Sequence, residues 1–263
     1  MRVGFFQYAP EFGQVKRNLD YVSERISQTR CDLLVLPELF ATGYQFASKN
    51  EVEALAEPVP DGPTTGRLSE LARMCGMYVV AGLAERSGPH VYNSAVVVGP
   101  AGYIGCYRKT HLFFEETIFF APGNSGFQVW DIGAVRVGVM VCFDWFYPES
   151  ARALALKGAD IVCHPSNLVL PHCPDAMVTR CLENHVFCIT ANRTGSEERG
   201  GKERLTYIGS SEIVDPHGQI LHRAPGDREE LVVVDIDPAH ARDKALNSYN
   251  DLLRGRQPQY YGV

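Results

Sequence analysis

Apolar and polar residues alternate along the chain with two different periods, and the pattern predicts strands and helices that follow one another. Residues 3–8 and 32–36 are short apolar runs of the kind that form buried strands. Between them, apolar residues recur at spacings of four, three and four, which indicates one face of an amphipathic helix: Val15, Leu19, Val22 and Ile26. The chain therefore begins with strand, helix and strand.

The same succession of strands and helices continues to residue 236. Further strands are predicted at residues 78–83, 93–98, 103–107, 127–131, 135–141, 160–163, 188–191, 206–214, 219–222 and 231–236. Further helices are predicted at residues 68–74, 148–156 and 174–186, the last with Met177, Cys181 and His185 on one face. Turn sequences at residues 99–102, 132–134 and 215–218 connect neighbouring strands. Because hairpins alternate with helix-linked strands, we expect an α/β fold with mixed sheets, in a single domain over residues 1–263.

The composition indicates a folded protein with an ordinary core. Of the 263 residues, 45% are hydrophobic and 21% are charged, which excludes a mainly disordered chain. The net charge is -6 and the basic residues form no dense cluster, so nucleic acid is not an expected partner. No apolar run reaches the roughly 20 residues that span a bilayer, and the N-terminus does not resemble a signal peptide. We therefore expect no membrane attachment, a cytoplasmic location, and eight reduced cysteines.

Three separate segments carry side chains of chemical interest. Glu38 directly follows an apolar strand that ends at Pro37, and α/β folds place functional groups at this end of a strand. Lys109 follows the strand at residues 103–107, and Cys142 lies where a strand gives way to a helix. Taken singly, each has an ordinary structural explanation: a turn-capping carboxylate, a solvated surface lysine and one more buried thiol.

Their joint occurrence points to nucleophilic catalysis. A free thiol is only slightly ionised at neutral pH, so a nucleophilic cysteine needs a base or a positive neighbour. Glu38 could accept the proton of Cys142, while Lys109 could lower the pKa of the thiol and later stabilise an oxyanion. The backbone N–H of Phe143 could be a second oxyanion donor, because it directly follows the nucleophile.

The sequence resembles the nitrilase superfamily of carbon–nitrogen hydrolases. The resemblance rests on LPELFATGY around Glu38, YRKTHLF around Lys109 and VGVMVCFDWFYPES around Cys142, in that order, and extends over GADIVCHPSN, RCLENHVFCITANRTG and NDLLRGRQPQYY. It implies a four-layer αββα sandwich, a Glu38–Lys109–Cys142 triad and a second glutamate, placed at Glu116 with Glu115 as the adjacent alternative. It also implies a small-molecule substrate and a homodimer or a higher even oligomer.

Chemistry and resemblance together predict hydrolysis of a small non-peptide amide through a thioester on the cysteine, with release of ammonia or an amine. The same residues would serve a nitrilase, which converts a nitrile to an acid and ammonia, or an N-carbamoyl amide hydrolase. Pocket shape and polarity decide among these reactions. A catalytically silent binding module is the non-enzymatic alternative.

Several further residues are expected at or near the site. We place Tyr44, Trp145 and Asn167, together with Phe143, in the substrate pocket, and we expect His164 to border it. Two adjacent pairs, Cys163 with His164 and His172 with Cys173, contain zinc-binding residue types, but adjacent residues rarely face one ion together. We therefore expect no metal and no cofactor.

Overall fold

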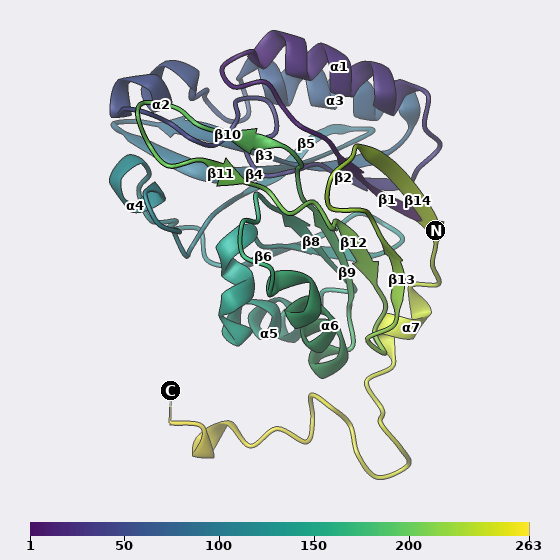
Figure 1. The fold of residues 1–263 in the computed structure, drawn as a ribbon. Helices are drawn as coiled ribbons and strands as arrows, with labels where there is room; N and C mark the ends of the chain where they lie inside the picture. The colour runs from purple at the N-terminus through teal and green to yellow at the C-terminus, as the bar shows by residue number, and fades with distance from the viewer. Residues whose placement is uncertain (263) are drawn as a thin grey trace.

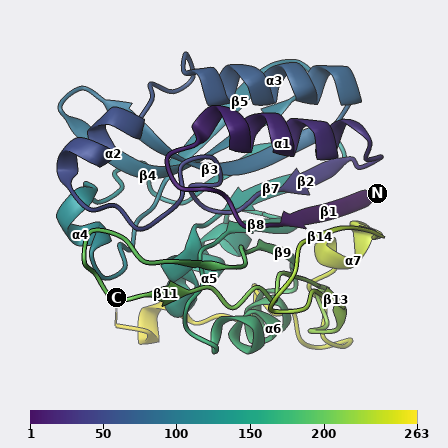
Figure 2. The same cartoon turned by 45° about the horizontal axis from the view of Figure 1, so that its top comes forward.

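Two six-stranded mixed sheets pack face to face, and helices cover the outer face of each (Figures 1 and 2). The structure is a computed structural model that describes residues 1–262. Its layers run helix, sheet, sheet, helix, which confirms the αββα sandwich expected above.

The first sheet is built mainly from the first half of the chain, in the order β14-β1-β2-β3-β4-β5. The strands β1, β2 and β3 are parallel, and the remaining pairs are antiparallel. The strands are β1 (Arg2–Gln7), β2 (Leu33–Val35), β3 (Tyr78–Ser87), β4 (His90–Gly99), β5 (Gly102–Arg108) and β14 (Glu230–Asp235).

The second sheet has the order β13-β12-β9-β8-β7-β6, with β7, β8 and β9 parallel. Its strands are β6 (Gln128–Asp131), β7 (Arg136–Val139), β8 (Ile161–Pro165), β9 (Phe187–Ala191), β12 (Glu212–Val214) and β13 (Ile220–Arg223). A small separate ribbon pairs β10 (Ser196–Glu197) with β11 (Leu205–Thr206).

Two helices lie over each sheet. In Figure 1, α1 (Val15–Ser27) and α3 (Pro63–Cys75) cover the first sheet, while α5 (Pro148–Leu156) and α6 (Cys173–Asn184) cover the second. The shorter helices are α2 (Lys49–Leu55), α4 (Glu116–Phe119), α7 (Ala239–Arg242) and the 3-10 turns η1 (Cys142–Phe146) and η2 (Pro258–Tyr260). After α7 the chain continues as an extended tail below α5 and α6 in Figure 1.

The main hydrophobic core lies between the sheets. Strands of both sheets contribute to it, for example Phe5, Val35 and Val80 from the first and Val137 and Ile161 from the second. Because both faces of the inner strands are covered, these strands are apolar at almost every position instead of alternating. The apolar character of residues 32–36 thus follows from their place in the middle of the first sheet.

The structure corrects two predicted elements. The helix predicted at residues 174–186 ends at Asn184, because His185 adopts a left-handed φ of 46° and caps the helix instead of extending its apolar face. The strand predicted at residues 206–214 is interrupted by left-handed φ values at Gly209 and Ser210, which separate β11 from β12.

Within residues 1–262, none of the helices has the length and apolar character needed to cross a bilayer. All eight cysteines lie in this part of the chain and are free thiols. The cytoplasmic location itself stays a prediction.

Candidate active site

A buried ion cluster lies where strands of the first sheet end. Glu38 comes shortly after β2, Lys109 directly after β5, and Glu116 begins α4. The ammonium of Lys109 donates to Glu38 Oε1 at 2.7 Å and to Glu116 Oε1 at 2.8 Å. All three side chains are almost completely buried, so one cation holds two carboxylates out of contact with water.

The main chain at Glu38 is held close to the neighbouring strand. A Cβ added to Gly82 on β3 would lie 2.5 Å from Glu38 Cα, so this approach requires a glycine. On the other side, the Asn167 amide donates to the Glu38 carbonyl oxygen at 2.9 Å. Glu38 is thus fixed between the first sheet and the segment that follows β8 of the second.

The two oxygens of the Glu38 carboxylate have different surroundings. Oε1 accepts hydrogen bonds from Lys109 and from the Asn93 amide on β4, both at 2.7 Å. Oε2 is buried and has no hydrogen-bond partner within residues 1–262. A buried acceptor without a partner is costly, so Oε2 is the oxygen that can accept a hydrogen bond from a bound molecule.

Cys142 reaches the cluster from the second sheet. It follows β7 by a short segment, opens η1 and is 4% exposed. Its φ of 42° lies in the left-handed region, which is uncommon for a residue with a Cβ and marks a strained turn. The turn places the Cys142 side chain at the junction of β7 and η1.

The charges of the cluster shift its pKa values. Burial alone would lower the pKa of Lys109, but the carboxylates of Glu116 and Glu38 outweigh it and raise that pKa. Burial raises the pKa of Glu116 to about 7, against the opposing effect of Lys109. Burial and the Glu38 charge raise the pKa of the Cys142 thiol, while Lys109 and the Asn167 backbone N–H lower it. The resting cysteine is therefore a thiol that needs a base.

A buried carboxylate, Asp144, joins the segment of Lys109 to the turn of Cys142. Its Oδ1 accepts the His111 backbone N–H at 3.1 Å and lies 2.7 Å from Nδ1 of the His111 ring. Its Oδ2 accepts the Tyr107 hydroxyl at 2.7 Å and the Val141 N–H at 2.9 Å. Tyr107 and His111 flank Lys109, and Val141 precedes Cys142, so Asp144 fixes both functional side chains relative to each other.

The structure brings most of the expected site residues together. Trp145, Asn167 and Phe143 line a small hollow beside Cys142, whose volume is about 10 Å³ and whose other walls are Phe113, Leu168, Val169 and Leu170. Tyr44 lies on the cluster itself, where its hydroxyl donates to Glu116 Oε1 at 2.6 Å. Its contact is thus with the second glutamate.

Glu116 and Glu115 differ clearly in their surroundings. Glu116 is 3% exposed and contacts Lys109, whereas Glu115 pairs with Lys202 at 2.7 Å on a partly exposed segment. The geometry therefore favours Glu116 as the second glutamate. The sequence motifs did not identify Asn93 or Asp144, although the polar pair Asn93 and Ser94 in the otherwise apolar run of residues 91–98 was a usable signal for Asn93.

The two cysteine–histidine pairs have other contacts. His164 places Nε2 2.9 Å from the carbonyl oxygen of Cys142, and its ring is completely buried. Cys173 begins α6 in the core. Within residues 1–262 no group of three or more His, Cys, Asp or Glu side chains is arranged to hold a metal ion.

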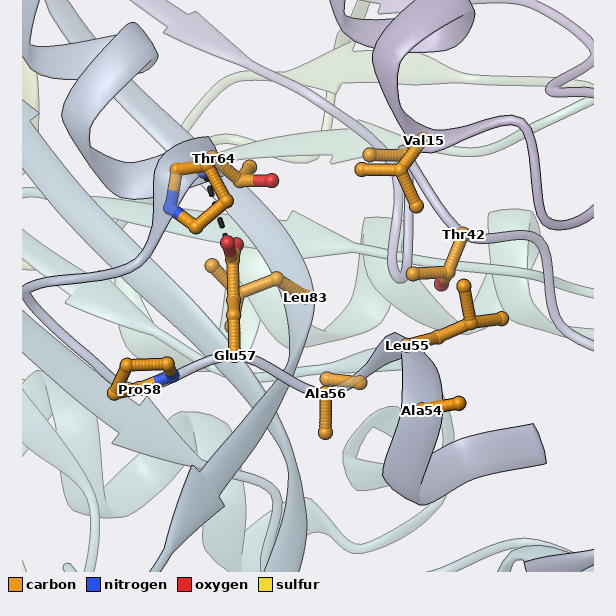
Figure 3. Close-up of a pocket in the computed structure, with 12 residues that line it drawn as sticks. Val15, Thr42, Ala54, Leu55, Ala56, Glu57, Pro58, Thr64 and Leu83 are labelled. Atoms are coloured by element: carbon orange, nitrogen blue, oxygen red, sulfur yellow. Dashed lines mark hydrogen bonds between the residues drawn. The ribbon is translucent and has the colours of Figure 1, made fainter. Parts of the chain in front are cut away.

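A larger hollow lies elsewhere and contains none of these groups. It has a volume of about 380 Å³ and is lined mainly by apolar side chains around Glu57, from α2, the start of α3 and residues 41–42 (Figure 3). Glu57 accepts the Thr64 N–H at 2.9 Å, the dashed contact in Figure 3, and so satisfies a free N–H at the start of α3. Its carboxylate thus has a structural explanation.

Known proteins resemble this chain over nearly its full length. The model of a family described as carbon-nitrogen hydrolase matches residues 2–245. A nitrilase from Pyrococcus abyssi (strain GE5 / Orsay) is 48% identical over 264 residues, covering 99% of each chain. An (R)-stereoselective amidase from Pseudomonas sp is 34% identical, covering 99% of this chain and 95% of the relative. Among solved structures, this chain is similar to a mutant amidase from Nesterenkonia sp. AN1, with a TM-score of 0.81 and 27% identity over 98% of this chain and 94% of that chain. That structure shows the acetamide moiety of fluoroacetamide added covalently at the amidase's active-site cysteine.

Proposed function

Because the chain belongs to the carbon–nitrogen hydrolase family and hydrolyses carbon–nitrogen bonds other than peptide bonds, we propose that its substrate is a small primary amide and its nucleophile is Cys142. The observation that carries this proposal is the buried cluster around Lys109, in which Glu38 keeps one oxygen free to accept a proton. The mechanism below follows from that arrangement.

Acylation begins with proton transfer from the Cys142 thiol to Glu38 Oε2. The sulfur then forms a bond to the amide carbon, and the π electrons of the carbonyl move to its oxygen. When the tetrahedral intermediate collapses, the carbon–nitrogen bond breaks and Glu38 gives its proton to the departing ammonia. A water molecule, deprotonated by Glu38, then attacks the thioester; the carbon–sulfur bond breaks, the sulfur recovers the proton from Glu38, and the acid is released.

The developing oxyanion has two donors. One is the ammonium of Lys109, and the other is the backbone N–H of Phe143, which has no acceptor within residues 1–262. Glu116, held by the Tyr44 hydroxyl, keeps the Lys109 ammonium in place together with Glu38. Losing one such donor typically costs ~10²–10³ in rate.

Unpartnered acceptors support an amide over a nitrile. The amide nitrogen of Asn167 donates to the carbonyl oxygen of Glu38, so the Asn167 Oδ1 faces away from Glu38. This Oδ1 has no hydrogen-bond partner within residues 1–262. The same holds for Glu38 Oε2. A primary amide brings two N–H donors that can satisfy such acceptors, whereas a nitrile nitrogen has none.

The walls of the hollow support a short apolar acyl group. Phe113, Trp145 and Leu170 are apolar, and among residues 1–262 no charged side chain lines this space. A substrate with a charged tail, as in many N-carbamoyl compounds, would need a buried counter-charge here. The small free volume further favours a short chain.

Nitrile hydrolysis remains the second candidate, because the relative from Pyrococcus abyssi at 48% identity is called a nitrilase. The reaction would use the same nucleophile and base on a carbon–nitrogen triple bond. The distinguishing feature is then the preference between an amide and the nitrile of the same acyl chain.

The test measures ammonia release from matched amides, nitriles and N-carbamoyl compounds of one to four carbons. We expect amides such as propionamide to be preferred and Cys142→Ala to abolish turnover. Cys181→Ala, which removes another buried thiol, on α6, is the matched control and should retain activity. Preference for nitriles would select the second candidate, and full activity in Cys142→Ala would refute the thiol mechanism.

We also propose that the protein is a homodimer or a higher even oligomer. Apolar side chains are exposed on the helix layer of the second sheet: Phe146, Tyr147, Leu156 and Leu182. Light scattering should give at least twice the mass of one chain, and Leu182→Asp should lower that mass. Met74→Asp on α3 changes an exposed apolar residue of the other helix layer and should leave it unchanged. A wild-type monomer would contradict this proposal.

A further inference from the structure

His164 is a completely buried histidine that the reaction steps above do not use. It lies on β8, with Nε2 2.9 Å from the carbonyl oxygen of Cys142 and Nδ1 3.1 Å from Oγ1 of Thr190 on β9. The Ser166 hydroxyl also lies 3.1 Å from Nε2. The ring therefore connects two strands of the second sheet to the main chain of the nucleophile.

The partners of the ring determine its tautomer. A carbonyl oxygen only accepts hydrogen bonds, so Nε2 must carry the proton that it donates to Cys142. Nδ1 is then an acceptor, which the Thr190 hydroxyl can satisfy. Burial lowers the pKa of His164 to about 4, so the ring is neutral at ordinary pH and keeps this arrangement.

The hydrogen bond to Cys142 also controls the next N–H. The carbonyl of Cys142 and the N–H of Phe143 belong to one peptide unit, which is planar and trans, so they point in opposite directions. A donor that holds the oxygen therefore also holds the direction of the N–H. The φ of 42° at Cys142 is uncommon for a residue with a Cβ, and the contact from His164, outside the 3-10 turn, helps to hold this peptide unit in place.

We propose that His164 is a positioning residue that aims the Phe143 N–H at the oxyanion by holding the carbonyl oxygen of Cys142. The proposal rests on the thiol mechanism proposed above. In that step the sulfur–carbon bond forms, the carbonyl π pair moves to oxygen, and the resulting negative charge lies between Lys109 and the Phe143 N–H. Hydrogen bonding at the carbonyl also polarises the peptide unit and makes its N–H a better donor.

A role in the oxyanion site differs measurably from a role in packing. If His164 only supported the core, its loss would displace Cys142 and slow every reaction of the thiol. If it aims the Phe143 N–H, its loss slows reactions that place negative charge on a carbonyl oxygen and spares reactions that do not. Two small probes separate these cases.

The first probe is methyl methanethiosulfonate, which gives Cys142 a methylthio group and releases methanesulfinate without forming an oxyanion. Modification is followed by peptide mass spectrometry, with the half-buried Cys75 as an internal reference. The second probe is propionaldehyde, which adds reversibly to the thiolate. A carbon–sulfur bond forms, the π pair moves to oxygen as a negative charge, and the thiol proton passes to Glu38, as in the acylation step. The measured quantity is the aldehyde concentration that half-protects Cys142.

His164→Leu should leave the methylthiolation rate of Cys142 within about twofold of the wild-type rate. It should raise the aldehyde concentration needed for half-protection by about 10-fold or more, since complete loss of an oxyanion donor typically lowers a reaction rate by ~10²–10³. With an amide substrate, kcat should fall by a similar factor while KM changes little. His164→Gln can still donate from a similar position and should recover most of the protection. Thr190→Val, a milder change, should give a smaller loss in the same direction.

The exposed His240 of α7 provides the control variant, and His240→Leu should match wild type with both probes. Equal aldehyde protection in His164→Leu and wild type would overturn the proposal. So would a parallel loss with both probes that His164→Gln does not recover, or a wild-type protein that the aldehyde never protects. The aldehyde measurement needs no turnover, so absence of amide hydrolysis by wild type would refute the proposed function without deciding the role of His164.

Discussion

Replacing Asp144 by asparagine should weaken both the fold and the reaction. The carboxylate accepts hydrogen bonds at both oxygens, from Tyr107 and Val141 on one side and from His111 on the other. An asparagine can keep its oxygen toward Tyr107 and Val141. Its NH2 group then faces His111, whose ring can accept in the other tautomer but whose backbone N–H loses its acceptor.

The expected loss follows from these contacts. Hydrogen bonds to a charged group contribute about 1.5–3 kcal/mol each, and a buried donor left without a partner costs about 1–3 kcal/mol. One lost bond and the weakening of the others give a decrease of about 2–3 kcal/mol in the free energy of unfolding. For a domain of this size, that corresponds to a Tm lower by roughly 4–10 °C. Because Asp144 also sets the position of Lys109 relative to Cys142, kcat should fall by about 10-fold or more.

Urea unfolding, thermal unfolding and steady-state kinetics test this prediction at one protein concentration. Asp131→Asn is the matched control, because Asp131 is exposed and its Oδ1 accepts only the nearby Gly133 N–H. Tyr107→Phe removes one donor from Asp144, and its effect should be less than additive with that of Asp144→Asn. A variant within 0.5 kcal/mol of wild type with unchanged kcat, on the order of the error of such measurements, would refute the reasoning.

Three further predictions concern pH and close backbone contacts. Turnover should rise as pH increases through about 7, because the ionised form of Glu116 holds the Lys109 ammonium and its pKa is raised to about 7. Tyr44→Phe removes a hydrogen bond that lowers this pKa, so the midpoint should move to higher pH; an unchanged midpoint in the pH–rate profile would contradict this. Gly82→Ala should lower both Tm and activity, because the added Cβ would lie 2.5 Å from a backbone atom, whereas Gly66→Ala, with nothing within 4 Å, should leave activity unchanged. The pKa of His164 is lowered by burial from 6.5 to about 4, so between these values the unfolded state binds more protons and stability falls as pH decreases. The loss should reach about 3 kcal/mol near pH 4, and urea unfolding of His164→Gln should lack this part of the slope.

The parts of the fold that periodicity predicts are those with strong local patterns. The apolar stripe of α1 and the helix from Pro148 to Leu156 agree with the structure because burial selects the same residues that form the pattern. The interruption at residues 209–210 was not predicted, although Gly209 and Ser210 break the apolar run and are residue types typical of loops. Short elements such as α4 carry too few residues for a period to be read.

In the site too, some features can be predicted from the sequence and others depend on the packing of the folded chain. Motifs single out Glu38, Lys109 and Cys142, but their approach depends on pairing between residues far apart in the sequence. The difference between Glu115 and Glu116 cannot be read from the sequence, since successive residues of a helical turn point about 100° apart and only the packing decides which one faces inward. The contacts of Asp144 are likewise invisible, because they join two loops through a single side chain.

The last strand of the first sheet pairs with the first strand of the chain. β14 is hydrogen-bonded to β1 along its whole length, from Arg2 opposite Asp235 to Gln7 opposite Glu230, and the N-terminal ammonium donates to the Ile236 carbonyl at 2.9 Å. During synthesis, Glu38, Lys109 and Cys142 all leave the ribosome long before β14 does. A nascent chain thus contains all three of these residues while β1 still has an open edge, the kind of surface that favours pairing with other chains. Closing this sheet requires contact between β1 and β14, which lie far apart in the sequence, and such long-range pairing is a slow step in folding.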